Sequence, residues 1–149
     1  MKQLERRARF TACMRLTRRK LTCIVTVPFN QGRLAMSISF KDPNESLRHI
    51  RLSGRLDIPG IDAISTAFAE LSASTRRSIV VDLSEVDFLV SFGIRELITN
   101  AKVIHKRGGR MVIFVGDNQA VRKTLVTTGI DTLIPTFTDA SQADEAALE

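Results

Sequence analysis

The segment from residue 78 to residue 107 carries the strongest folding signal in this chain of 149 residues. It opens with Ser78-Ile79-Val80-Val81-Asp82-Leu83, an apolar run rich in β-branched residues, which is typical of a buried parallel strand. From Ile94 onward, apolar residues recur at spacings of three and four, which predicts a helix with one buried face. A buried strand followed by such a helix favours an α/β fold, with Ser91 where a loop turns into the helix.

The remaining elements are expected to alternate between strand and helix, which predicts a parallel or mixed sheet covered by helices. Apolar stretches bounded by turn residues predict further strands at Met36–Phe40, Leu47–Gly54, Met111–Val115 and Leu133–Phe137. A helix is expected after the break at Pro59-Gly60, ending near residue 73. A short helix, capped by Asp117 or Asn118 and closed by Gly129, and a terminal helix capped by Asp139 complete the pattern.

The net charge of +6 is placed unevenly along the chain. Residues 1–35 hold nine Lys or Arg and one Glu, whereas residues 36–149 hold thirteen basic and fifteen acidic residues. We therefore expect a basic extension over residues 1–35, either disordered or a mis-assigned start, and a mildly acidic domain over residues 36–149 that does not bind nucleic acid directly. Within the extension, residues 21–29 could form a short strand.

Cellular location is read from the apolar stretches and the cysteines. No stretch approaches the ~20 continuous apolar residues of a membrane span, and the apolar segment before Pro28 lacks the cleavage site of a signal peptide. Cys13 and Cys23 both lie in the extension and provide neither a disulfide framework nor a metal site. We expect a cytoplasmic protein without membrane insertion.

Ser91 has three possible roles. As a helix N-cap, its side-chain oxygen would accept a hydrogen bond from the first turn, worth about 1 kcal/mol. As a nucleophile it would need a nearby base and a Gly-x-Ser-x-Gly elbow, but Val90 and Phe92 flank it instead. As a phosphorylation site it would place the added negative charge at a helix N-terminus, where the helix dipole favours it.

From Met36 onward the chain resembles the STAS domain family, and within it the bacterial anti-sigma-factor antagonists that work by partner switching. Five motifs carry the resemblance: Gly54-Arg55-Leu56-Asp57, the run from Val80 to Leu89, Ser91-Phe92-Gly93, Arg107 to Val112, and Ala120 to Leu125 followed by Thr128 to Asp131. The resemblance implies an α/β fold with a small mixed β-sheet of four to five strands and about four helices packed mainly on one side.

The resemblance also implies a site around Ser91. Family members commonly read Asp-Ser-Ser-Gly or Asp-Ser-Thr-Gly here, and Ser91 matches the serine that a cognate kinase phosphorylates. Val90 replaces the Asp of that pattern, and Phe92 replaces the second hydroxyl residue. The residues implied to bind the partner are Asp57, Val90, Phe92, Gly93 and Arg95.

The implied function is that of an anti-sigma factor antagonist, which binds a kinase-type anti-sigma factor and is switched off by phosphorylation of Ser91. A phosphatase would be a further partner, and ATP would belong to the kinase. Two alternatives remain: an accessory subunit or regulatory domain of a membrane transporter that is not phosphorylated, and an antagonist that has lost its kinase control.

Catalysis is not expected, and neither a cofactor nor a metal is called for. The chain has no glycine-rich phosphate loop and no plausible pair of general base and nucleophile. Asp82 near a strand end could suggest a phosphorylated receiver domain, but the acidic pair and the lysine of that fold are missing. Asp82 is interpreted as a turn or surface residue, and His49 as a solvated strand residue.

Overall fold

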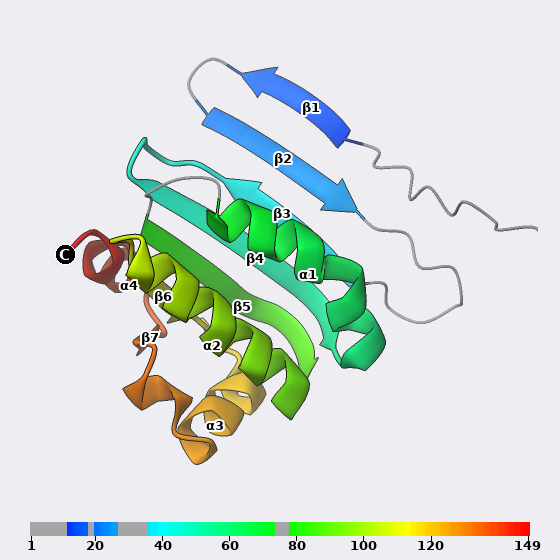
Figure 1. Ribbon diagram of the computed structural model, residues 1–149, viewed down its shortest axis with the longest axis vertical. Coiled ribbons are helices and arrows are strands. Elements are labelled where there is room, and N and C mark those ends of the chain that lie inside the picture. Colours follow the sequence, from blue (N-terminus) through cyan, green and yellow to red (C-terminus); the bar gives the residue numbers. More distant parts are fainter. Residues whose placement is uncertain (1–11, 18–19, 27–35, 74–77) are drawn as a thin grey trace, which may run out of the picture.

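The computed structural model describes residues 12–17, 20–26, 36–73 and 78–149, which form one sheet and the helices around it (Figure 1). The strands are β1 Ala12–Thr17, β2 Lys20–Thr26, β3 Ser37–Lys41, β4 Leu47–Leu56, β5 Ser78–Leu89, β6 Met111–Phe114 and β7 Thr136–Phe137. The helices are α1 Ile58–Ala73, α2 Ser91–Lys106, α3 Gln119–Thr127 and α4 Ala140–Leu148, with a 3₁₀ turn at Ile130–Thr132.

The strands follow one another across the sheet in chain order. Strands β1 to β4 pair in antiparallel fashion, whereas β4 to β7 pair in parallel, each parallel step being connected through helical structure. The predicted mixed sheet is thus confirmed, with five strands, β3 to β7, in the expected domain. Strands β1 and β2 add two more from the basic extension, and β2 overlaps the strand expected at residues 21–29. The origin of residues 1–35 stays a prediction.

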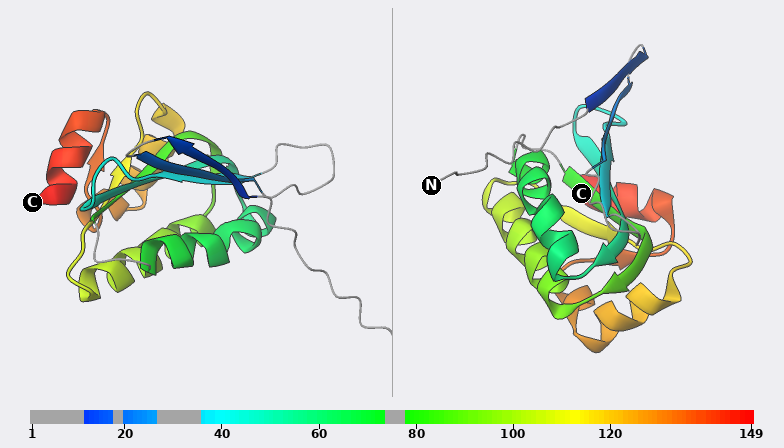
Figure 2. Two further views of the ribbon diagram at one scale, coloured as in Figure 1. Left: turned by 90° about the horizontal axis from the view of Figure 1, so that it is seen from above. Right: turned by 90° about the vertical axis from the view of Figure 1, so that its right-hand side faces the viewer.

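The two faces of the sheet are covered unequally (Figure 2). Helices α1 and α2 lie side by side on one face, where their apolar residues form a single core cluster with the inward side chains of β3 to β6 and with Val121 and Leu125 of α3. Helix α4 lies on the other face, where Ala143 and Ala147 pack on a small cluster around Val80. The expectation of helices mainly on one side is confirmed, with α4 as the exception.

Strand β5 extends further than the sequence pattern predicts. The apolar run ends at Leu83, but the strand continues to Leu89, because Val86 and Leu89 still point into the core. Val86 pairs with Gly54 of β4 past one register shift between the strands, and Leu89 pairs with Leu56 past a second. A single residue, Val90, therefore connects β5 to α2, in place of the loop expected before Ser91.

The helix ends agree largely with the sequence prediction. Asn118 caps α3 by accepting a hydrogen bond from the Val121 backbone N–H, and Asp139 caps α4 in the same way. Gly129, at φ 72°, closes α3 in the left-handed conformation that glycine tolerates best. The last strand is shorter than predicted, since the chain before it turns back in hydrogen bonds to the Ile130 carbonyl.

Helix length and polarity also bear on membrane association. None of the described helices combines the length and the apolar character that crossing a bilayer requires.

Candidate functional site

The candidate site lies at the carboxyl ends of β4 and β5, where α1 and α2 begin close together (Figure 1). The two strand ends are in register, with Leu56 opposite Leu89. The Val90 backbone N–H then donates to the Leu56 carbonyl oxygen at 3.2 Å, which ties the start of α2 to the end of β4. In α/β sheets, this edge is where ligands and partners are commonly bound.

Ser91 is the first residue of α2 and does not cap it, contrary to one of the three roles considered above. Val90 occupies the cap position in an extended conformation, and no side chain completes the cap. The hydrogen bond from the Val90 N–H to the Leu56 carbonyl holds Val90 at the strand ends and makes it the cap residue. Ser91 therefore falls one position inside the helix. Ser91 is exposed, and no side chain in the described part of the chain hydrogen-bonds to its hydroxyl.

Asp57 connects α1 to the strand ends. Its Oδ1 accepts from the Gly60 backbone N–H at 3.1 Å, which caps α1, and its Oδ2 accepts from Arg55 Nε at 3.2 Å. Helix α1 therefore begins at Ile58 and includes Pro59 and Gly60, which had been expected to precede it. Proline is tolerated there because the first-turn N–H groups need no partner within the helix.

Two phenylalanines close to Ser91 in the chain, Phe88 and Phe92, each have an arginine over the ring. The Arg55 guanidinium carbon lies 4.7 Å from the centre of the Phe88 ring, and that of Arg95 lies 5.8 Å from the Phe92 ring. Both distances fall in the range of cation–π contacts. Phe88 and Phe92 are nevertheless 46% and 45% exposed.

The Ser91 surface is the name used below for six exposed residues and the half-buried Asp57: Arg55, Asp57, Ile58, Phe88, Ser91, Phe92 and Arg95. Ile58 adds a further apolar side chain that is 58% exposed. Exposed apolar side chains gathered in one place are a common mark of a binding surface. Sequence reasoning missed Ile58 and Phe88 as site residues, because both are apolar and only the folded chain shows that they are exposed.

The five residues predicted to bind the partner differ in exposure. Phe92 and Arg95 are exposed, Asp57 and Val90 are half-buried, and Gly93 is buried. A Cβ atom on Gly93 would lie 3.0 Å from Leu89 Cδ1 and 3.3 Å from the Leu56 carbonyl oxygen. Gly93 thus allows α2 to pack closely on the strand ends, and its part in partner binding stays a prediction.

Comparison with known proteins identifies the family. The family model of the STAS domain matches residues 41–143, more than half of the chain. The chain belongs to the STAS domain family. A comparison of this STAS domain with curated proteins finds no match.

Solved structures show the same fold. An anti-sigma factor antagonist from Mycobacterium paratuberculosis is 22% identical, with a TM-score of 0.69 over 77% of this chain and 96% of that one. The unphosphorylated form of the anti-sigma factor antagonist SpoIIAA is 17% identical, with a TM-score of 0.59 over 73% and 95%. The phosphorylated form of the Bacillus cell fate determinant SpoIIAA is 16% identical, with a TM-score of 0.55 over 73% and 98%.

Other polar candidates in this STAS domain have structural partners. Asp82 is only 6% exposed and accepts from Arg51 Nε at 2.9 Å and from the backbone and hydroxyl of Ser84. His49 is half-buried, and its Nε2 lies 2.8 Å from Oδ1 of Asp144 in α4. The interpretation of His49 as a solvated residue was therefore wrong. Strand β4 is central in the sheet, and α4 folds onto the His49 side of it. The described residues contain no metal-binding group of three or more His, Cys, Asp or Glu.

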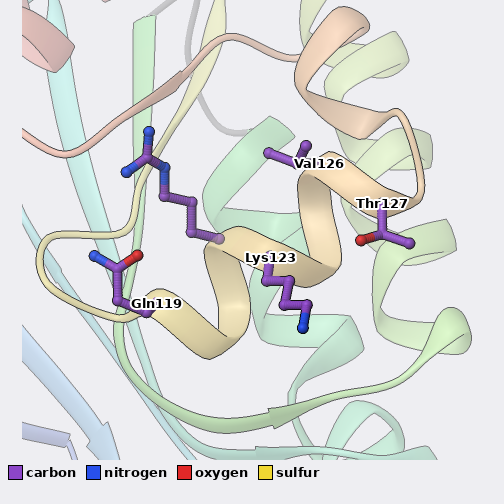
Figure 3. A pocket seen from close by; sticks show the side chains of 5 residues that line it. Gln119, Lys123, Val126 and Thr127 are labelled. Carbon is purple, nitrogen blue, oxygen red and sulfur yellow. The ribbon is translucent and has the colours of Figure 1, made fainter.

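A shallow pocket on the STAS domain lies along α3 (Figure 3). Its lining residues are Gln119, Arg122, Lys123, Val126 and Thr127. All five come from one exposed helix, so the pocket lacks the convergence of polar groups from several elements that small-molecule sites have. We assign no ligand to it.

Proposed function

We propose that this STAS domain is an anti-sigma factor antagonist that binds a kinase-type anti-sigma factor through the Ser91 surface. Phosphorylation of Ser91 by that kinase would release it. The observation that carries the proposal is an exposed serine at the first residue of α2, with an exposed phenylalanine on each side of it in the chain, in the fold of the antagonist structures. Such rings are typical anchors of a protein interface.

The position of Ser91 supports a switch that acts on the surface. A phosphate adds nearly two negative charges and three acceptor oxygens, and the dipole of α2 favours negative charge at its first residue. The helix would therefore tolerate the modification. A partner that covers Phe88, Ser91 and Phe92 would have to desolvate the phosphate as well, and Asp57 adds a further negative charge to the same surface. Binding would weaken although the fold stays the same.

The proposed activity is binding alone, in the cytoplasm. Ser91 would accept a phosphoryl group from ATP bound to the kinase, and a phosphatase would remove it. The STAS domain itself would need no metal or cofactor for either step.

The test has two stages. A pull-down from the native host with the full chain as bait, followed by mass spectrometry of Ser91, identifies the partner and its modification. Titration calorimetry with the recovered partner then compares S91A and S91D with the native protein. We expect S91A to bind as the native chain does, and S91D to bind at least about tenfold more weakly, a loss of about 1.4 kcal/mol.

The matched control is S141D. Ser141 is also an exposed serine in the first turn of a helix, but α4 lies on the opposite face of the sheet. We expect S141D to bind with native affinity. Equal binding by S91A and S91D would reject the switch.

A second function is favoured by Val90 and Phe92, which stand where the family pattern has an acid and a hydroxyl residue. They suit a STAS domain that is not phosphorylated, serving as an accessory subunit or regulatory domain of a membrane transporter. Recovery of a transporter ATPase in the pull-down would support this function. An anti-sigma factor recovered without phosphate on Ser91 would indicate an antagonist that has lost kinase control.

A further inference from the structure

We propose that Arg95 binds the phosphate of phosphorylated Ser91, and that its guanidinium leaves the ring of Phe92 to do so. This inference rests on the proposed phosphorylation of Ser91. It adds a regulatory residue to that site and explains how one phosphate changes the aromatic part of the Ser91 surface as well as its charge.

Ser91 and Arg95 are placed to interact. They are four residues apart in α2, and both are exposed. Side chains at this spacing are neighbours on a helix surface, and the pair is more favourable when the acidic group is the N-terminal one. A phosphate on Ser91 would meet this condition, and a guanidinium can donate two parallel hydrogen bonds to phosphate oxygens.

Arg95 is also free to move. Its guanidinium carbon lies 5.8 Å from the centre of the Phe92 ring, near the outer limit of a cation–π contact. Among the residues that the structure describes, no carboxylate lies within ion-pair distance of Arg95. Among the described residues, the exposed ring contact is therefore the only charge-related interaction of Arg95 that a phosphate would have to replace.

Arg55, the second arginine of the Ser91 surface, is held more firmly. It donates to Asp57 at 3.2 Å and lies closer to its ring, at 4.7 Å from the centre of Phe88. Withdrawing it would break an ion pair and a closer ring contact together. The two arginines thus differ in their expected response: Arg95 turns to the phosphate and uncovers Phe92, while Arg55 stays over Phe88.

The experiment places phosphoserine at position 91 of the full chain by genetic-code expansion and follows its phosphorus NMR signal against pH. Pairing with Arg95 stabilises the dianion, so R95Q should raise the second pKa of the phosphate, ordinarily near 6, by about half a unit. Lys102 is exposed on the same helix, about three turns after Ser91, so K102Q removes an equal charge as the control and should leave the pKa unchanged. Native phosphoprotein should also lose nuclear Overhauser contacts between the Arg95 side chain and the Phe92 ring.

An unchanged phosphate pKa in R95Q, or an equal rise in K102Q, would overturn the proposal. So would ring contacts of Arg95 that persist after phosphorylation. No partner protein enters these measurements, so their outcome is separate from that of the proposed function. Retention of the anti-sigma factor by the phosphoprotein would reject the release mechanism even if Arg95 binds the phosphate.

Discussion

Phe88 and Phe92 are the side chains through which the Ser91 surface would bind a partner most tightly. Each exposes nearly half of its surface, and truncation removes a large apolar contact without opening a cavity in the core. We expect F88A and F92A each to weaken partner binding about tenfold or more, with the free energy of unfolding changed by less than about 1 kcal/mol. Titration calorimetry and urea unfolding measure the two quantities.

Leu133 provides the matched control for these truncations. It is 67% exposed and lies between the 3₁₀ turn and β7, outside the Ser91 surface. L133A should retain native affinity. If L133A weakened binding as much as the two phenylalanine variants, the proposed location of the interface would be wrong.

Asp57 caps α1 through a hydrogen bond and also carries a negative charge that pairs with Arg55. Two substitutions separate the contributions of the cap and the charge to stability. D57A removes the cap of α1 and should lower the free energy of unfolding by about 1 kcal/mol. D57N keeps a capping oxygen, so most of that stability should remain although the ion pair with Arg55 is lost. Circular dichroism is the suitable probe for urea unfolding, since the chain has no Trp or Tyr. An equal loss in both variants would contradict the capping role.

The first turns of α1 and α2 are held against the strand ends by two glycines. A Cβ atom on Gly60 would overlap the backbone carbonyl oxygen of Arg55, whereas one on Gly93 would only crowd Leu89 and Leu56. We therefore expect G93A to cost about 1–3 kcal/mol, the usual range for overpacking, and G60A to cost more, because backbone yields less than a side chain. Urea unfolding ranks the two variants, and the reverse order would contradict this packing.

Most elements were predictable from apolar spacing, because β4, α2 and β6 each bury a regular set of side chains. The end of β5 was not, since Asp87 and Phe88 are both exposed and interrupt the apolar pattern. The capping role of Ser91 was expected from its residue type alone. It failed because a long-range hydrogen bond, from Val90 to Leu56, decides where α2 begins.

The residues of the candidate site also fall into two groups, those that sequence reasoning found and those that it missed. Ser91 was found from its place between the strand pattern and the helix pattern, and Asp57 and Phe92 were added through the family resemblance, since they belong to motifs that are visible along the chain. Phe88 was missed because its residue type gives no sign that it is exposed, and the pairing of His49 with Asp144 was missed because it joins distant segments of the chain. Local sequence patterns report which side chains are buried, but they do not report which exposed side chains become neighbours.

At the scale of the whole molecule, the proposed function implies that stability and binding can be changed separately, because α4 packs on the face of the sheet opposite α1 and α2. Ala143 is fully buried between α4 and the sheet. A143D would bury a carboxylate among apolar side chains and should lower the free energy of unfolding by about 2–4 kcal/mol. The molecules that remain folded should bind the partner with native affinity. Urea unfolding and calorimetry at low temperature measure both effects.

E145Q is the control for this variant, since Glu145 is exposed on the same helix. It should leave both the stability and the affinity near their native values. A loss of affinity in folded A143D would mean that the two faces of the sheet are coupled.

The single-residue connection at Val90 also restricts how this protein can diverge over generations. An insertion or deletion between β5 and α2 would shift Gly93 away from the backbone of Leu56, where a side chain does not fit. Heritable change here must therefore come by exchanging one residue for another at constant length. Val90 and Phe92 are such exchanges relative to the family pattern, and they change the side chains beside Ser91 in the chain without changing the length of the connection.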